Sequence, residues 1–283
     1  MKRFIALLIT SLSLTGIVCI SCGNDNLHPT PEQSPIAPKA DGVFRIMTYN
    51  VGAINKFVSD SFTKENNLNM LAAIVREAEA DAVCFQELDS CNKRNDYFQL
   101  ERLTQAIDKN WSYHYAPAIK YRDGKYGTGA AAKDSPVKCF DIFIPTREGS
   151  EDRAVAVMEF EKYVICSTHL NYGQTDQVEL INDTITKLYA DSDKAVFLGG
   201  DMNANIGDET MNTFCKDWRV ISQTELGSTV ITVNKPCIDF ILQFNNKAKA
   251  VEVIDSKVIK SANAGDVKIA SDHYPVYVDV VLN

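Results

Sequence analysis

The sequence lacks any long run of basic residues, and acidic side chains outnumber basic ones. Its 283 residues include 29 Lys and Arg against 37 Asp and Glu, which gives a formal net charge of −8. An acidic protein repels the phosphate backbone of nucleic acids, so strong nonspecific DNA binding is disfavoured, although a local basic patch would still allow a nuclease. Internal repeats are also missing. The composition, 45% hydrophobic and 23% charged, is typical of a globular protein.

Cysteine pairs with the spacing of a zinc knuckle are missing from the part of the chain that we expect to fold. Two of the eight cysteines, Cys19 and Cys22, lie in the N-terminal segment. Cys84 and Cys166 lie in apolar runs, where a free cysteine usually acts as a small buried hydrophobe. We therefore expect neither a zinc site nor disulfide bonds. The six cysteines after the N-terminal segment, none in a Cys-x-x-Cys pair, are Cys84, Cys91, Cys139, Cys166, Cys215 and Cys237.

The N-terminus has the features of a targeting segment. Lys2 and Arg3 precede an apolar stretch, residues 4–20, which leads directly into polar residues. A positive start and a short apolar stretch are typical of a signal peptide, and the stretch stops too soon for a membrane span. We therefore expect residues 1–21 to be removed.

The segment Ile20-Ser21-Cys22-Gly23 resembles a bacterial lipoprotein cleavage box. That pattern has leucine or a similar residue where this chain has Cys19, which leaves ordinary secretion as an alternative. We expect Cys22 to carry lipid and to anchor the protein to a membrane of the cell envelope, facing the periplasm or the surface. The proline-rich residues 22–42 are then a flexible tether, and the folded domain spans 43–283.

Hydrophobic patterns predict more strands than helices. Apolar residues at helical spacing predict helices at 66–80, 98–107 and 174–190. Because several strands follow one another as hairpins, the pattern favours an α+β fold with packed sheets and outer helices. Apolar or alternating runs predict strands at 43–50, 81–86, 112–117, 129–133, 137–144, 154–160, 163–167, 196–198, 238–243, 249–254 and 275–282.

The stretch Val196–Asn205 ends an apolar strand with Gly-Gly-Asp-Met-Asn-Ala-Asn. Two glycines allow a sharp turn, and Asp201 and Asn203, two positions apart, point to the same side in extended geometry. An acid and an amide presented together can hold a water, a metal or a phosphate oxygen. An ordinary Asx turn is the alternative for this short motif.

Three more polar side chains follow predicted strands. Glu87 comes directly after an apolar strand, where a carboxylate can bind a hard cation such as Mg²⁺, and Asn50 has the same placement. His169 could donate to a phosphate oxygen or protonate a leaving group. A solvated strand end, or a structural histidine, is the alternative for each of them.

Asp239 lies between apolar residues, and a buried carboxylate needs a partner. The segment Ser271-Asp272-His273-Tyr274-Pro275 offers one, because His273 could be held in orientation and tautomer by Asp239. Asp272, beside this histidine, could complete a metal site.

Six short motifs span most of residues 43–280. In chain order they are Thr-Tyr-Asn (48–50), Gln-Glu (86–87), Ser-Thr-His-Leu (167–170), Gly-Asp-Met-Asn (200–203), Ile-Asp-Phe-Ile (238–241) and Ser-Asp-His-Tyr-Pro (271–275). Each motif is weak alone, and their ordered coincidence is specific. Together they resemble the motifs of the endonuclease/exonuclease/phosphatase superfamily, which includes DNase I-like, exonuclease III-like and sphingomyelinase-like proteins.

This resemblance implies a four-layered α/β/β/α sandwich with two mostly antiparallel sheets face to face. It also implies a Mg²⁺- or Mn²⁺-dependent attack on a phosphoester. Glu87 and Asn50 would hold the metal, with Asp272 close to it. Such roles fit the chemistry, because Mg²⁺ prefers oxygen ligands and phosphoryl transfer depends mainly on positioning and charge neutralisation.

The resemblance also implies catalytic roles for five residues. Asp201 would position or deprotonate the attacking water, and Asn203 would bind the phosphate. His169 would contact the phosphate or assist the leaving group. His273, oriented by Asp239, would clamp the phosphate or act as the base.

One segment departs from the family. Many members have a Gly-Asn-Ala strand where this chain has Gly129-Ala130-Ala131, so Ala130 lacks an amide expected to face the substrate. The departure affects the expected substrate contacts and not the catalytic set.

We consider three functions. The first, which we favour, is a phosphodiesterase or phosphatase acting outside the cytoplasm, as a monomer, on a small or lipid-linked phosphate. The second is a secreted or surface nuclease, and the third is a non-catalytic binding domain, against which the complete motif set argues. The nuclease hypothesis depends on interleaved basic and aromatic residues, which a solvated loop would also explain: Lys120, Tyr121, Arg122, Lys125, Tyr126 and Lys133.

Overall fold

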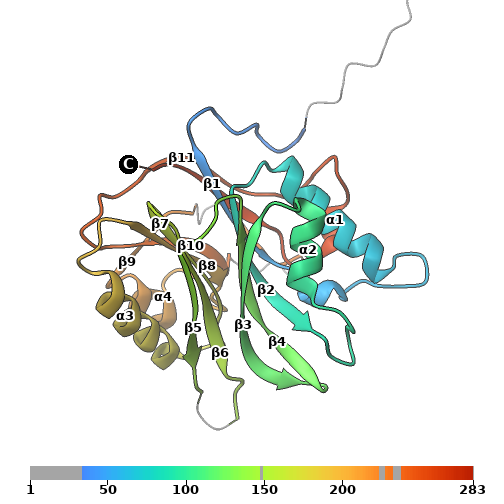
Figure 1. Ribbon diagram of the computed structural model, residues 1–283, viewed down its shortest axis with the longest axis horizontal. Helices are drawn as coiled ribbons and strands as arrows, with labels where there is room; N and C mark the ends of the chain where they lie inside the picture. Colours follow the sequence, from blue (N-terminus) through green and yellow to red (C-terminus); the bar gives the residue numbers. More distant parts are fainter. Residues whose placement is uncertain (1–33, 147–148, 223–226, 232–236, 283) are drawn as a thin grey trace, which may run out of the picture. The chain divides into compact units, whose positions relative to one another are not determined.

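Two six-stranded sheets form the centre of the protein (Figure 1). The last strand of the chain, β12, pairs with the first, β1, so both ends of the folded chain lie in the same sheet. The first sheet has the order β11 (Glu252–Val258), β12 (Val276–Val281), β1 (Phe44–Asn50), β2 (Ala82–Ser90), β4 (Gly124–Ala132) and β3 (Ser112–Tyr121). The second has the order β5 (Lys138–Ile144), β6 (Arg153–Glu159), β7 (Tyr163–His169), β8 (Ala195–Asp201), β10 (Asp239–Phe244) and β9 (Trp218–Val220).

The computed structural model describes residues 34–146, 149–222, 227–231 and 237–282. The predicted signal peptide, the predicted lipid site Cys22 and the first part of the predicted tether lie outside these residues. No helix in the described ranges has the length and apolar character needed to cross a membrane.

Each sheet contains one parallel pair of strands, β1–β2 and β7–β8, and its other pairs are antiparallel. A helix joins the strands of each parallel pair: α1 (Lys64–Glu77) and α3 (Thr175–Tyr189). Helix α1 starts at a capping box, in which the Thr63 side chain and the N–H of Asn66 are paired. Parallel strands bring their carboxyl ends to the same end of the sheet.

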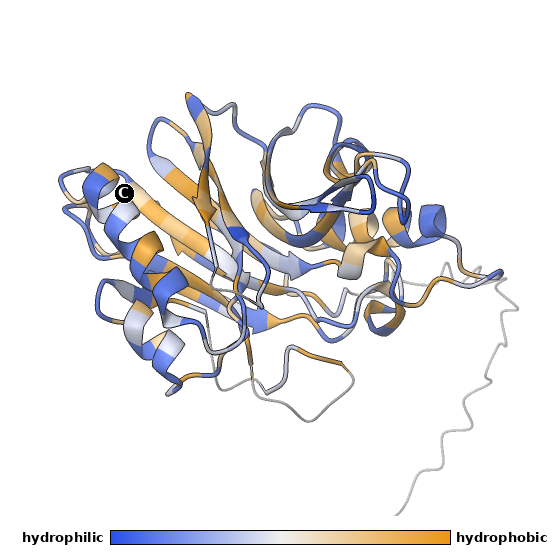
Figure 2. Ribbon diagram, turned by 90° about the horizontal axis from the view of Figure 1, so that it is seen from below, coloured by the Kyte–Doolittle hydropathy of each residue, from blue (hydrophilic) through white to orange (hydrophobic). Residues whose placement is uncertain are grey.

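The helices and sheets form four layers. Helices α1 and α2 (Gln99–Ile107) cover the outer face of the first sheet, and α3 and α4 (Glu209–Phe214) cover the second (Figure 1). A buried cluster that includes Ile46, Cys84, Phe197 and Ile241 fills the space between the sheets. Apolar residues accordingly gather along the central strands (Figure 2). The layers confirm the predicted α+β sandwich.

Most predicted elements are present within a few residues of their expected ends. Strands β3 and β4 are longer than predicted and form a hairpin that includes the basic and aromatic residues 120–126. Strand β11 lies later than the predicted 249–254. Four elements were not predicted, because each is too short to show a hydrophobic pattern: η1 (Gly52–Ile54), α4, β9 and α5 (Val267–Ala270).

The end of the predicted tether is packed on the domain. Ile36 is 4% exposed and belongs to the core cluster beneath α1. Lys39 Nζ lies 2.6 Å from a carboxylate oxygen of Asp81, and Arg45 Nη1 donates to the Ala37 carbonyl at 3.1 Å. Folded structure therefore starts before the expected residue 43.

Candidate active site

Three predicted residues lie in one row at the same end of the second sheet. His169 and Asp201 are the last residues of β7 and β8, and their Cα atoms are partners in the parallel register. Asp201 is in turn paired with Asp239, the first residue of β10. The sequence places them there because each ends or begins an apolar run that is buried between the sheets and helices.

Asn50 connects the first sheet to this row. It is the last residue of β1, and its Nδ2 donates to Asp201 Oδ2 at 3.0 Å and to Glu87 Oε1 at 3.1 Å. Asn50 therefore links the predicted metal residue Glu87, in the first sheet, to the predicted water-activating residue Asp201, in the second.

Glu87 lies in a bulge and not at a strand end as the sequence suggested, because β2 continues to Ser90. Gln86 and Glu87 together face the single residue Thr128 of β4, and Glu87 has φ 57°. A non-glycine residue in the left-handed region costs free energy and is found where a bulge re-aims a side chain. Thr128 Oγ1 supports the bulge by donating to the Phe85 carbonyl at 2.7 Å.

Asn203 also has a left-handed backbone, with φ 47°. Its N–H donates to Asp201 Oδ1 at 2.9 Å, so the Asx turn proposed as an alternative is present and presents both side chains. Asn203 Nδ2 donates to the Leu170 carbonyl at 2.9 Å and lies 3.1 Å from His169 Nε2. The Asx turn therefore also brings the Asn203 side chain to His169.

His273 is held by Asp239 as the sequence predicted. His273 Nδ1 lies 2.9 Å from Asp239 Oδ2, and both residues are buried. The other ring nitrogen, Nε2, lies 3.7 Å from Asp201 Oδ2, and His169 Nε2 lies 3.6 Å from the same oxygen. One carboxylate oxygen therefore faces both histidines.

Burial and neighbouring charges shift the pKa values of three groups in the site in different directions. Burial, together with the charge of Asp239, raises the pKa of Asp201 to about 7. Burial alone would lower the pKa of His273, but Asp239 and the other nearby carboxylates raise it to about 10. Burial, and then the charges of Arg153 and His273, hold the pKa of His169 well below its usual value.

The donor set around Asn50 fits a hard divalent cation. Glu87 and Asp272 supply carboxylates, and Asp272 Oδ1 is buried without a hydrogen-bond partner among the described residues. Gly52 (φ 55°) donates its N–H to Asn50 Oδ1 at 3.1 Å, and a Cβ added to it would lie 3.2 Å from Asp272 Oδ1. Any larger residue at position 52 would therefore crowd the space between two predicted ligands.

A second group of possible ligands is less suitable for a cation. Atoms of Asp201, Asp239 and His273 lie within 4.8 Å of one another. However, Asp239 Oδ2 and His273 Nδ1 already bond to each other, so this trio is better suited to handling a proton. Asn50, Glu87 and Asp272 are therefore the residues whose oxygen atoms could hold a cation.

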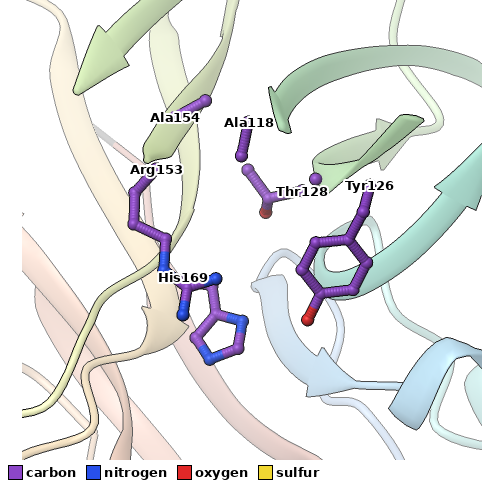
Figure 3. Close-up of a pocket in the computed structure, with 7 residues that line it drawn as sticks. Ala118, Tyr126, Thr128, Arg153, Ala154 and His169 are labelled. Carbon is purple, nitrogen blue, oxygen red and sulfur yellow. The ribbon is translucent and has the colours of Figure 1, made fainter. Parts of the chain in front are cut away.

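The structure brings all eight predicted residues together and adds three that the sequence analysis did not single out as site residues. Lys56 Nζ pairs with Asp272 Oδ2 at 2.7 Å, and Arg153 and Tyr126 line a pocket with His169 (Figure 3). Tyr126 was noted only as part of a basic and aromatic loop. A lysine in a loop and an arginine before a strand usually lie in solvent, so no sequence pattern identified Lys56 or Arg153 as a site residue.

Two residues considered for substrate contacts lie away from the pocket beside His169. Ala130 is buried in the cluster between the sheets and does not line the pocket beside His169. Lys133 lies just beyond the far end of β4, where its Nζ pairs with Asp81 Oδ1 at 2.8 Å. The basic and aromatic residues noted in the sequence therefore do not form one surface.

The chain belongs to the Endonuclease/Exonuclease/phosphatase family, which it matches over residues 47–273. This family generally hydrolyses phosphoester bonds. A search of curated proteins found no match.

Solved structures with the same fold include a named phosphatase and two proteins bound to sulfate or DNA. Mannosyl-6-phosphatase from Bacteroides thetaiotaomicron is 16% identical with a TM-score of 0.66, over 84% of this chain and 99% of that one. The human Nocturnin catalytic domain with bound sulfate is 15% identical with a TM-score of 0.63, over 89% and 100%. D. rerio TDP2, complexed with a single-strand DNA product, is 17% identical with a TM-score of 0.60, over 85% and 99%. Likeness at this identity concerns the fold and leaves the substrate open.

Proposed function

We propose that this protein hydrolyses a phosphoester with a bound Mg²⁺ or Mn²⁺ ion. The observation that carries the proposal is the position of Asp201 Oδ2, which faces both histidines and is bonded to the amide of Asn50. Asn50, Glu87 and Asp272 would hold the cation. When bound, the cation supplies positive charge that offsets the charge of the phosphate.

Each side chain of the site has a separate role in the proposed reaction. Asp201, with its pKa near 7, accepts the proton of the attacking water at neutral pH. His273 is protonated at that pH and donates from Nε2 to a phosphate oxygen, while Asp239 fixes its ring. Asn203 and His169 lie on the other side of Asp201, where they contact the phosphate or assist the leaving group.

We further propose that the substrate is a small or lipid-linked phosphate outside the cytoplasm. The leader-like N-terminus, the acidic net charge and the absence of a long basic run in the sequence support this proposal. A fold relative is named as a mannosyl-6-phosphatase, which fits a small phosphate ester. A nuclease is the second candidate, favoured by the β3–β4 hairpin, where the Arg94 guanidinium lies 4.7 Å from the Tyr121 ring.

Chelation tests the proposed chemistry. Purified protein should hydrolyse one or more members of a panel of sugar phosphates, nucleotides, phospholipids, sphingomyelin, inositol phosphates, RNA and DNA, detected as free phosphate from monoesters and as the new monoester from diesters. EDTA should abolish this hydrolysis and Mg²⁺ or Mn²⁺ should restore it. An Asp201→Asn sample prepared in parallel controls for contaminating phosphatases. Full activity in EDTA would refute the metal assignment.

Membrane anchoring is proposed from the cleavage box and is tested separately. Cys22→Ser should move the protein from the membrane pellet to the soluble fraction in cell fractionation, because the lipid-bearing residue is lost. A variant that still sediments with membranes would contradict the lipoprotein assignment.

A further inference from the structure

Lys56 is a basic residue of the candidate active site to which the proposed reaction gives no role. Its Nζ lies 2.7 Å from Asp272 Oδ2, and its side chain is 49% exposed. The Asp272 side chain is only 13% exposed, and its other oxygen, Oδ1, is buried without a hydrogen-bond partner among the described residues. A cationic side chain therefore holds one oxygen of a carboxylate that is proposed to bind a cation.

The turn that precedes Lys56 is buried and strained. Gly52, Ala53 and Ile54 of η1 all have left-handed backbone, with φ of 55°, 54° and 49°. Two of these residues are not glycine, so their conformation costs free energy. Backbone of this kind persists only where the surrounding structure holds it, and it is found most often at functional sites.

Two buried amides hold this turn in place. The Ala53 carbonyl accepts hydrogen bonds from Gln99 Nε2 at 2.6 Å and from Asn95 Nδ2 at 3.1 Å. Gln99 Oε1 in turn accepts from a backbone N–H of β2 at 2.7 Å, just beyond the bulge. The backbone that leads to Lys56 is therefore tied to the strand whose bulge directs the proposed cation ligand of that sheet.

The side chain of Lys56 starts directly beside the proposed cation ligands. A Cβ added to Gly52 would lie 3.4 Å from Lys56 Cβ and 3.2 Å from Asp272 Oδ1. The negative charge of Glu87 also attracts the ammonium group. Lys56 is therefore drawn to both of the carboxylates that are proposed to hold the cation.

The ammonium group and a divalent cation need the same carboxylates. Two positive groups at Asp272 repel each other, and the repulsion in a partly buried site is several times stronger than in water. Lys56 has a flexible stem and faces solvent on one side, so its ammonium group can move. We propose that Lys56 competes with the divalent cation for Asp272 and moves to a phosphate oxygen of the substrate when the cation binds.

This inference rests on the proposed function for the cation site and for the position of the phosphate, and it adds a residue that couples the two. Lys56 weakens binding of the cation alone, because its pair with Asp272 must break. It weakens binding less when an oxyanion is present, because the ammonium group then has another partner. Cation and phosphate should therefore bind cooperatively, and each should strengthen binding of the other by the same factor.

Titration calorimetry of Mn²⁺ into the purified protein in chloride buffer tests the competition. Lys56→Met keeps the length of the stem and removes the charge. It should bind Mn²⁺ about three- to tenfold more tightly than the wild type, because no ion pair has to break and no like charge remains. Lys56→Arg keeps the charge and should show no gain. Lys247→Met, which removes an exposed ion pair with Asp193 before the start of β8, is the matched control and should bind like the wild type.

The same titration in sulfate at equal ionic strength tests the move to the phosphate, since sulfate is also a tetrahedral oxyanion. Sulfate should tighten Mn²⁺ binding to the wild type at least about threefold more than binding to Lys56→Met. An equal effect of sulfate on both proteins would overturn the move to the phosphate.

Equal or weaker Mn²⁺ binding by Lys56→Met than by the wild type would overturn the competition and would leave the proposed cation site in place. Saturable binding by Lys56→Met with none by the wild type would support the competition in its strongest form. No Mn²⁺ binding by the wild type or by any variant would instead refute the cation site, and with it both the proposed function and this inference.

Discussion

Strand β1 has a buried polar residue near each end, Arg45 and Asn50. The polar groups around these two residues differ in how completely they are paired. Arg45 is fully buried, and its Nε and Nη2 donate to both oxygens of Asp279 at 2.6 and 2.7 Å. Its Nη1 donates to the Ala78 carbonyl at 2.7 Å, and the guanidinium lies 4.1 Å from the Tyr277 ring. Every nitrogen of this buried cation therefore has a partner.

At the other end of the same strand, about 16 Å away at 3.3 Å per residue, several buried polar atoms have no hydrogen-bond partner among the described residues. Asp239 Oδ1, Asp272 Oδ1 and His169 Nδ1 are buried without partners among the described residues. Glu87 and Asn203 add left-handed backbone there. Since unpaired buried groups and strained backbone cost stability, we infer that the proposed catalytic end is kept ready for a ligand, whereas the Arg45 end stabilises the fold.

The largest expected effect is on activity at the catalytic end. Asp201→Asn removes the proposed proton acceptor and should lower kcat/KM by roughly 10²–10⁴-fold. The free energy of unfolding should stay the same or rise, because a buried carboxylate is replaced by a neutral amide. Steady-state kinetics and urea denaturation measure the two effects. Asp193→Asn, at an exposed position, is the control. A near-normal rate for Asp201→Asn would remove this residue from the chemical step.

The reverse pattern is expected at the Arg45 end. Arg45→Met leaves Asp279 as an unpaired buried charge and should lower the free energy of unfolding by about 3–5 kcal/mol, with kcat unchanged for the folded protein. Urea denaturation beside Arg102→Met, at a half-exposed ion pair, checks the size of the effect. If Arg45→Met were as stable as the control, the two ends would not differ as described.

A smaller effect, on the pH dependence of stability, is expected at Asp81, where the segment before β1 contacts the first sheet. Burial opposes ionisation of Asp81, but bonds from Lys133, Lys39 and the Arg45 N–H lower its pKa. A lowered folded-state pKa adds stability above the unfolded pKa of about 3.9, which is lost as pH falls through the folded value. Asp81→Asn should therefore cost about 1–2 kcal/mol at pH 7 and progressively less below about pH 4, measured by urea denaturation across pH. A cost independent of pH would show that the charge of Asp81 is not the source.

Local patterns predicted packed sheets with outer helices and polar residues at strand ends, whereas the four layers and the grouping of these residues into one site came from the resemblance to the family. Alternating and apolar runs identify buried strands, and the polar residues that end them, such as Asn50 and Asp201, must lie at a sheet end. The pairing of Asp239 with His273 was predictable because a buried acid requires a partner.

Other features depend on contacts between segments far apart in the chain. The bulge at Glu87 requires β4 as its partner and the hydroxyl of Thr128, so the sequence around Glu87 reads as a plain strand end. The pocket beside His169 requires that Ala118 and Ala154, which come from different sheets, lie together. An alanine in a strand does not by itself indicate a pocket. Ile36 packs under α1 although its neighbours have the composition of a tether.

We propose that Glu87 and Asp272, near Asn50, are left open for a divalent cation, and a direct measurement of metal binding checks this proposal. Titration calorimetry of Mn²⁺ into the metal-free protein should show saturable binding. Glu87→Gln should weaken it at least about tenfold, and Glu252→Gln, at an exposed position, should not. Equal Mn²⁺ affinity of the wild type and Glu87→Gln, or no binding by either, would show that this end of β1 is not a cation site.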